Sequence, residues 1–393
     1  MSKRNKKRST HSRSPSMVKR PPRPFWHLVF SGVLVLVAVV ALLHAQWRDR
    51  PREPTPPPAP PVVAPAADGS ALADTLYAGA ATILDELGIW PDLITRTRRE
   101  SGPDLIRVQV PVDLPLAVVN LHLTRYVERV GGQMLRAVEG ASGRRVEMSC
   151  GFAGEATTRF LLERARRARR RTGQIAIVLD DFGYMSWDKR LIERFCSLSQ
   201  PLTLAVLPNE GKVDAILQLA REHGHEIILH LPMEPEDPEK DPGPGAIRTD
   251  ASDAEIREQV RQALRKVPSA AGINNHMGSK ATADSRVMEQ VLGELQARGL
   301  FFLDSRTSAE SVAFGLAKGM GVPTLSRDLF IDPVDDRQAA EAQLWELAAR
   351  AARSGSAIGI GHDRESTLLA LEAILPRLEM RGFRFVPLSA LAR

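Results

Sequence analysis

The chain has 393 residues, enough for two or three domains, and its hydrophobic fraction of 43% supplies a sizeable core. Its net charge of +6 comes from the N-terminus, where residues 1–24 hold nine Lys or Arg and no acidic residue. The rest of the chain is slightly acidic, so its composition gives no reason to expect nucleic-acid binding. Cys150 and Cys196 are the only cysteines, which excludes a disulfide framework and a zinc knuckle. We expect two buried thiols, with a single disulfide as the alternative.

Residues 25–47 predict a transmembrane helix that follows the basic tail of residues 1–24. Residues 28–43 within it are uncharged and almost wholly aliphatic, and with its flanks the segment is long enough for the ~20 residues that span a bilayer. Trp26 and Trp47 lie near its two ends, where aromatic rings prefer the membrane interface. The positive charge before the segment predicts a cytoplasmic tail, one pass through the inner membrane and export of the remaining chain to the periplasm. A cleaved signal peptide is the alternative, but the basic segment is long for one.

Residues 48–69 are rich in proline and predict a semi-extended tether. Polyproline geometry rises ~3.1 Å per residue, so the tether would reach up to ~60 Å from the bilayer. We expect it to act only as a spacer.

Residues 70–165 predict a small α+β domain with a ferredoxin-like sandwich as the expected architecture. The patterns follow the order α-β-α-β-β-β, and no catalytic cluster accompanies them. A binding or spacing role follows, with an envelope protein as the expected partner. The predicted elements are helices at 74–88 and 115–130 and strands at 105–112, 134–138, 145–150 and 157–162.

Residues 172–393 alternate strand and helix patterns, which predicts a parallel α/β domain. About seven strands, with a weaker one at 323–331, fit a distorted (β/α) barrel. An open doubly wound sheet is the alternative. The strands are expected at 174–180, 202–207, 226–231, 272–276, 300–304, 356–361 and 384–388.

Side chains suited to catalysis end several of these predicted strands. Because the carboxyl ends of parallel barrel strands converge on one rim, we expect the side chains to lie close together. The adjacent carboxylates of Asp180 and Asp181 repel each other unless a cation or a shared proton lies between them. The alternative is that Asp-Asp-Phe-Gly forms only a turn. The residues are Asp180, Asp181, His230, His276, Asp304 and His362.

Two imidazoles and one carboxylate with an open position form a typical catalytic site for zinc or a similar divalent ion. Such an ion lowers the pKa of a bound water and polarises a carbonyl group. A further carboxylate accepts the proton of the water, and a further histidine protonates the leaving group. These residue types predict metal-assisted hydrolysis of an amide or ester, with zinc as the expected metal.

Seven stretches follow one another in order: IVLDDFGY (177–184), LAVLPN (204–209), EIILHLPMEP (226–235), GINNHMGSKAT (272–282), FFLDSRTSAESVA (301–313), LFIDP (329–333) and AIGIGH (357–362). Together they resemble the divergent polysaccharide deacetylases, a branch of the NodB-like carbohydrate esterases. The resemblance implies a distorted barrel of about seven strands and metal-dependent removal of N- or O-acetyl groups from sugars. It covers nearly all of residues 174–393 and none of residues 1–165.

Carried over to this sequence, the resemblance assigns five residues. It implies that Asp180 is the catalytic base and Asp181 a metal ligand. His230 corresponds to the first metal histidine, and His276 supplies the second. His362 matches the position of the general acid. The sequence departs from ordinary members, which place both metal histidines about one helical turn apart, because His276 lies on a different strand from His230.

Three further polar residues are candidates for contact with the substrate. Asp304 either orients His362 or lines the sugar pocket. Asp332 and Arg306 are expected to contact a polar substrate, with plain salt bridges as the alternative.

The sequence as a whole predicts a membrane-anchored, periplasm-facing enzyme that deacetylates an envelope polysaccharide, with peptidoglycan or an exported glycan as the natural candidate. A non-catalytic glycan-binding or scaffold module of an envelope complex is the alternative. A different metallohydrolase on the same barrel would keep the site and change only the substrate.

Overall fold

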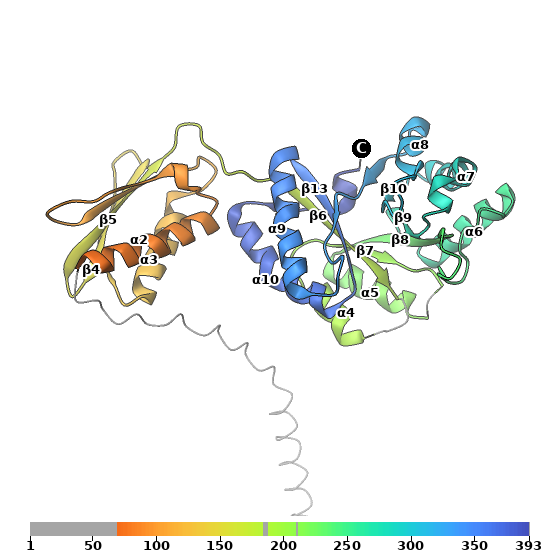
Figure 1. Ribbon diagram of the computed structural model, residues 1–393, viewed down its shortest axis with the longest axis horizontal. Helices are drawn as coiled ribbons and strands as arrows, with labels where there is room; N and C mark the ends of the chain where they lie inside the picture. Colours follow the sequence, from red (N-terminus) through yellow and green to blue (C-terminus); the bar gives the residue numbers. More distant parts are fainter. Residues whose placement is uncertain (1–68, 184–187, 210, 393) are drawn as a thin grey trace, which may run out of the picture. The chain divides into compact units, whose positions relative to one another are not determined.

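The structure is a computed structural model that describes residues 69–183, 188–209 and 211–392 (Figure 1). The predicted tail, the predicted transmembrane helix and the predicted tether up to residue 68 lie outside these ranges. Within the described ranges, no helix combines the length and the apolar character needed to cross a membrane. Both cysteines of the chain are buried and unbridged, as the sequence predicts.

The first folded part consists of a five-stranded sheet and two helices that share one hydrophobic core. The sheet order is β1-β2-β5-β4-β3, in which β2 and β5 are parallel and the other neighbours antiparallel. Its elements are α2 (Gly69–Glu86), η1 (Pro91–Leu93), β1 (Ile94–Thr97), β2 (Asp104–Val110), α3 (Leu116–Arg129), β3 (Gln133–Glu139), β4 (Arg145–Phe152) and β5 (Glu155–Arg164).

This strand order differs from the predicted ferredoxin-like arrangement. The observed order of elements is α-β-β-α-β-β-β, with an additional strand, β1, before β2. β1 pairs with β2, and Ile94 lies opposite Val108. A ferredoxin-like unit would instead follow β-α-β-β-α-β. β1 has only four residues, and three of them are Thr or Arg, so it carries no apolar alternation that sequence reasoning could detect.

The second folded part alternates parallel strands with helices (Figure 1). Its strands are β6 (Gln174–Phe182), β7 (Thr203–Val206), β8 (Glu226–Met233), β9 (Gly272–Met277), β10 (Phe301–Asp304), β11 (Thr324–Ser326), β12 (Leu329–Phe330), β13 (Ser356–His362) and β14 (Arg384–Phe385). Its helices are α4 (Lys189–Cys196), α5 (Val213–His223), α6 (Asp253–Lys266), η2 (Ala281–Ala283), α7 (Ser285–Gln296), α8 (Ala313–Met320), α9 (Arg337–Ser354), α10 (Glu365–Arg381) and η3 (Leu388–Ala390).

These strands follow the chain around a ring. β6 to β11 lie side by side in chain order, and β13 returns to pair with β6, with His362 in register opposite Asp180. A doubly wound sheet would instead reverse its winding at a switch point. This curled parallel sheet fits the predicted distorted (β/α) barrel.

The ring is incomplete between β11 and β12, which do not pair with each other. In the short connection between them, the Arg327 N–H donates to the Asp304 carbonyl (3.1 Å) and the Asp328 N–H donates to the Ile358 carbonyl (3.0 Å). The chain thus switches from β10 to β13 within two residues. This switch explains why the weak pattern at 323–331 corresponds to two very short strands.

Alternation along the strands decides which side chains enter the barrel lumen. On β6, Ala176 and Val178 belong to the lumen cluster, whereas Ile177 and Leu179 pack against the outer helices. β8, β9 and β13 alternate in the same way. At the carboxyl ends of these strands, the inward positions are Asp180, His230, His276 and His362.

Candidate metal site

Three side chains from different strand ends bring their ligand atoms together. Asp181 Oδ1 lies 3.2 Å from His230 Nε2 and 3.0 Å from His276 Nδ1. The two imidazole nitrogens lie 3.0 Å from each other. Both histidines are almost completely buried, while about a quarter of the Asp181 side chain is exposed. Among the described residues, this is the group of His, Cys, Asp and Glu side chains arranged to hold a metal ion.

An unusual backbone conformation places Asp181 in this group. Simple alternation would turn Asp181 away from the lumen, because Asp180 beside it points inward. Asp181 instead has a φ of +66°, in the left-handed region that few non-glycine residues adopt. Met277, after His276, and Arg306, after β10, have φ values of +53° and +49°. Such strain clusters at functional sites, where the surrounding structure maintains it.

The hydrogen bonds of Asn274 determine which ring nitrogen of His230 carries a proton. Asn274 Nδ2 donates to Asp180 Oδ1 (2.8 Å) and to Ser305 Oγ (3.2 Å). Its Oδ1 is therefore the acceptor that faces His230 Nδ1 at 2.8 Å. Nδ1 must carry the proton, so the neutral ring directs the Nε2 lone pair at the carboxylate of Asp181.

This arrangement of lone pairs fits a cation. A metal with bonds of ~2.0–2.2 Å to nitrogen and oxygen separates neighbouring ligand atoms by ~2.8–3.6 Å. The three observed separations fall in that range. Two imidazoles, one carboxylate and an open side suit zinc and similar divalent ions.

The pKa values of Asp181 and His230 also favour a positive charge between these side chains. Burial raises the pKa of Asp181, but hydrogen bonds from His230 and His276 hold it well below its usual range. Burial lowers the pKa of His230, but the charge of Asp180 and the hydrogen bond to Asp181 raise it to about 9. Without a metal, a proton would therefore occupy the position of the cation.

Asp180 lies beside the metal ligands and belongs to the same network. Its carboxylate is buried, and its Oδ2 lies 3.8 Å from His230 Nε2. Burial raises the pKa of Asp180, and the adjacent charge of Asp181 adds to the rise. A carboxylate with a raised pKa is a stronger base than an ordinary aspartate, which suits proton transfer.

His362 lies on the neighbouring strand and is held by Asp332. Its Nδ1 and its backbone N–H each lie 2.8 Å from a different Asp332 oxygen, and Thr367 Oγ1 also donates to Asp332 (2.5 Å). Burial lowers the pKa of His362, but the hydrogen bond to Asp332 and its charge outweigh burial and raise the pKa. The Nδ1 proton is thereby fixed on the Asp332 side, which leaves Nε2 for the site.

The structure corrects the predictions for substrate contact. Asp304 lies outside the lumen, because Phe301 and Leu303 are the inward residues of β10. Its buried carboxylate accepts from the Arg306 N–H (2.8 Å) and from Ser311 Oγ (2.8 Å), so it supports a loop and does not orient His362.

Asp332 is also buried, and its contacts with His362 and Thr367 make it a group that orients His362. Arg306 is exposed in the loop after β10, and its role in substrate contact remains a prediction.

Sequence reasoning missed Asn274 and Asp363, and it gave Asp332 a different role. Asn274 was detectable, because it lies two residues before His276 and so faces the same side of β9. The orienting role of Asp332 has no local signal, since it depends on the pairing of β12 with β13. Asp363, beside His362, is partly buried, and burial together with the charge of Asp181 raises its pKa to about 7.

The barrel part of the chain matches a known protein family. The family described as divergent polysaccharide deacetylase matches residues 177–392. An uncharacterized protein of Haemophilus influenzae is 37% identical over 205 residues, which cover 52% of this chain and 72% of that protein. The uncharacterized protein YibQ of Escherichia coli is 35% identical over 207 residues, which cover 52% of this chain and 63% of YibQ.

A solved structure shares the fold. The crystal structure of an uncharacterized protein from Agrobacterium tumefaciens matches with a TM-score of 0.54 and 25% identity, and the match covers 66% of this chain and all of that chain. The chain therefore belongs to the divergent polysaccharide deacetylase family, as the sequence motifs indicate.

Replacing Asn274 by Ala is predicted to weaken zinc binding about 10–100-fold, because the change releases the His230 ring and the Asp180 carboxylate. Zinc affinity is measured by competition with a chromogenic chelator. Asn209→Ala, which removes an exposed amide that contacts the Pro244 carbonyl, is the matched control and should bind zinc like the wild type. Equal affinity of Asn274→Ala and the wild type would contradict the proposed network.

Proposed function

We propose that this protein is a metal-dependent hydrolase that removes acetyl groups from an envelope polysaccharide. The observation that carries the proposal is the convergence of Asp181, His230 and His276, flanked by Asp180 and His362 at the same end of the barrel. Membership in the deacetylase family supports the reaction class. The identity of the metal, with zinc as our choice, and its need for activity are parts of the proposal.

The ligands would hold the ion on one side and leave the other side open. When bound, the ion supplies a Lewis acid that polarises the acetyl carbonyl and acidifies a water. Asp180 is placed to take the proton of that water, because Asn274 fixes one of its oxygens and the other lies beside the ligands. Its raised pKa increases its basicity.

His362 provides the proton for the departing amine or alcohol. Asp332 holds Nδ1 and stabilises the protonated ring, so Nε2–H is the available donor. The ring also lies nearly parallel to Phe330, with 5.9 Å between centroids, which limits its rotation. A base and an acid held on neighbouring strands suit the two proton transfers of amide or ester hydrolysis.

Location and substrate are further parts of the proposal. The hydrophobic segment at 25–47 and the basic tail before it support an inner-membrane anchor with the barrel in the periplasm. An acetylated glycan such as peptidoglycan is the substrate class that this location makes accessible.

Replacing Asp180 by Asn should lower kcat about 10²–10⁴-fold while the bound metal stays, because the base is lost and the ligands remain. Acetate release from chitooligosaccharides and from peptidoglycan is the measurement, with metal content determined on the same samples. Asp214→Asn, an exposed change on α5, is the control.

Two outcomes of this assay would contradict the proposal. Full activity of Asp180→Asn would show that another group is the base. Stoichiometric metal without acetate release by the wild type on either substrate would favour the non-catalytic glycan-binding module.

Replacing Asp332 by Asn should move the alkaline limb of the kcat/KM–pH profile to lower pH. His362 must be protonated to act as the acid, so activity is lost as pH rises through its pKa. Asp332 raises that pKa, and removing its charge lowers it. The acid limb, which reflects Asp180, should stay in place. An unmoved alkaline limb would mean that His362 is not the acid.

A further inference from the structure

The strand β3 lies at the outer edge of the five-stranded sheet, and no other described strand covers that edge. β3 has seven residues and, among the residues that the structure describes, pairs only with β4, so its other side offers backbone donors and acceptors to which no described strand is bonded. Leu135 and Val138 on this strand are 38% and 43% exposed. Natural edge strands are usually shortened, covered, bulged, or protected by proline or lysine. β3 has a register shift between Met134 and Arg136, but it is seven residues long and contains neither proline nor lysine.

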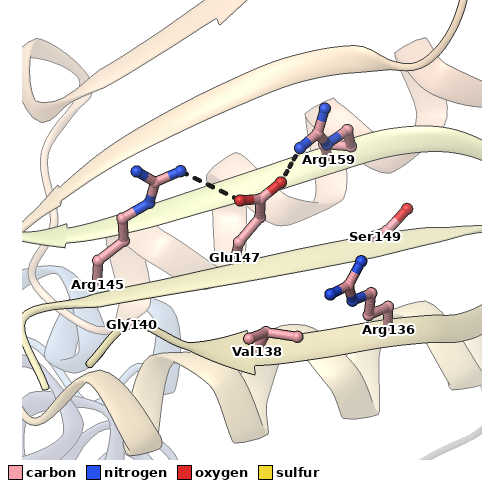
Figure 2. A pocket seen from close by; sticks show the side chains of 7 residues that line it. All are labelled: Arg136, Val138, Gly140, Arg145, Glu147, Ser149 and Arg159. Atoms are coloured by element: carbon pink, nitrogen blue, oxygen red, sulfur yellow. Dashed lines mark hydrogen bonds and ion pairs between the residues drawn. The ribbon is translucent and has the colours of Figure 1, made fainter.

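The sheet face beside this edge is positively charged (Figure 2). Register places Arg136 of β3 and Arg159 of β5 on either side of Ser149 of β4, all on the face away from the helices. With Arg145 they line a hollow of about 480 Å³. The row runs across the strands with ~4.5–5.5 Å between neighbouring positions, so Arg136 is the member closest to the outer edge of β3.

The charges of this hollow are only partly balanced within the protein. Glu147 forms ion pairs with Arg145 (3.1 Å) and with Arg159. Arg136 has no ion pair with any of the residues that the structure describes. Three guanidinium groups thus face one carboxylate, which leaves an excess of positive charge next to the open edge of β3.

We propose that β3 and the adjoining arginine face bind an extended acidic peptide segment of a partner protein by strand addition. Backbone groups of the peptide would pair with the outer edge of β3, and alternate acidic side chains would lie over Arg136 and its neighbours. A glycan fits less well, because no aromatic side chain lines the hollow and a sugar chain cannot complete the sheet edge. This surface is separate from the barrel site and does not depend on its activity.

The test uses the full chain and a fluorescent eight-residue peptide that alternates Glu with Val or Thr, measured by fluorescence anisotropy. Arg136→Glu should weaken binding about tenfold or more, since it replaces an attractive charged contact by a repulsive one. Arg125→Glu, the same change at an exposed position of α3 in the helix layer, should bind like the wild type. Added salt should weaken the wild-type complex.

Strand addition makes a second, sharper prediction. Two peptides are compared, one N-methylated at the odd residues and the other at the even residues. In one of them the methyl groups replace the N–H groups that donate to β3, so this peptide should lose binding. In the other, the methylated nitrogens point away from β3, so this peptide should still bind. Three outcomes would overturn the proposal. The wild type could fail to bind the peptide, the two N-methylated peptides could lose binding equally, or Arg125→Glu could weaken binding as much as Arg136→Glu does. Tighter binding of polygalacturonate than of the peptide, with the same sensitivity to Arg136→Glu, would reassign the surface to an anionic glycan.

Discussion

The site depends on one electrostatic constraint: three atoms with lone pairs meet within about 3 Å in a place with little water. Neutral imidazole nitrogens and a carboxylate oxygen repel one another at that distance unless a cation lies between them. Hydrogen bonds from both histidines hold the pKa of Asp181 below its usual range, and the charge of Asp180 together with the hydrogen bond to Asp181 raises the pKa of His230. A divalent ion satisfies all three ligands at once and leaves the two histidines neutral.

The backbone geometry of the barrel and the side-chain amide of Asn274 bring these side chains together. Alternation along these four strands, β6, β8, β9 and β13, directs Asp180, His230, His276 and His362 into the same lumen. The left-handed turn at Asp181 brings the ligand that alternation would direct outward. Asn274 then links the base to a ligand, because its two amide ends contact Asp180 and His230. The proposed base and the candidate metal site are therefore positioned by the same side chain.

The sequence predicted much of this arrangement, because apolar runs mark parallel strands and polar residues mark their carboxyl ends. The sequence-based prediction was wrong where the pattern of a strand did not show which of its side chains face the lumen. β10 is a short run of buried residues without polar alternation, so nothing local shows that Asp304 faces outward. Asp332 acts through a neighbouring strand whose pairing only the fold reveals. The placement of His276 beside His230 followed from the barrel itself, despite the unusual spacing in the sequence.

Metal content tests the central claim most directly. Wild-type protein and His276→Ala are dialysed, supplied with zinc, freed of excess ion and examined by elemental analysis. The account predicts about one divalent ion per wild-type chain and a marked loss in the variant, since one of three ligands is removed. Absence of metal in the wild type after zinc addition, or equal metal in the two proteins, would contradict it.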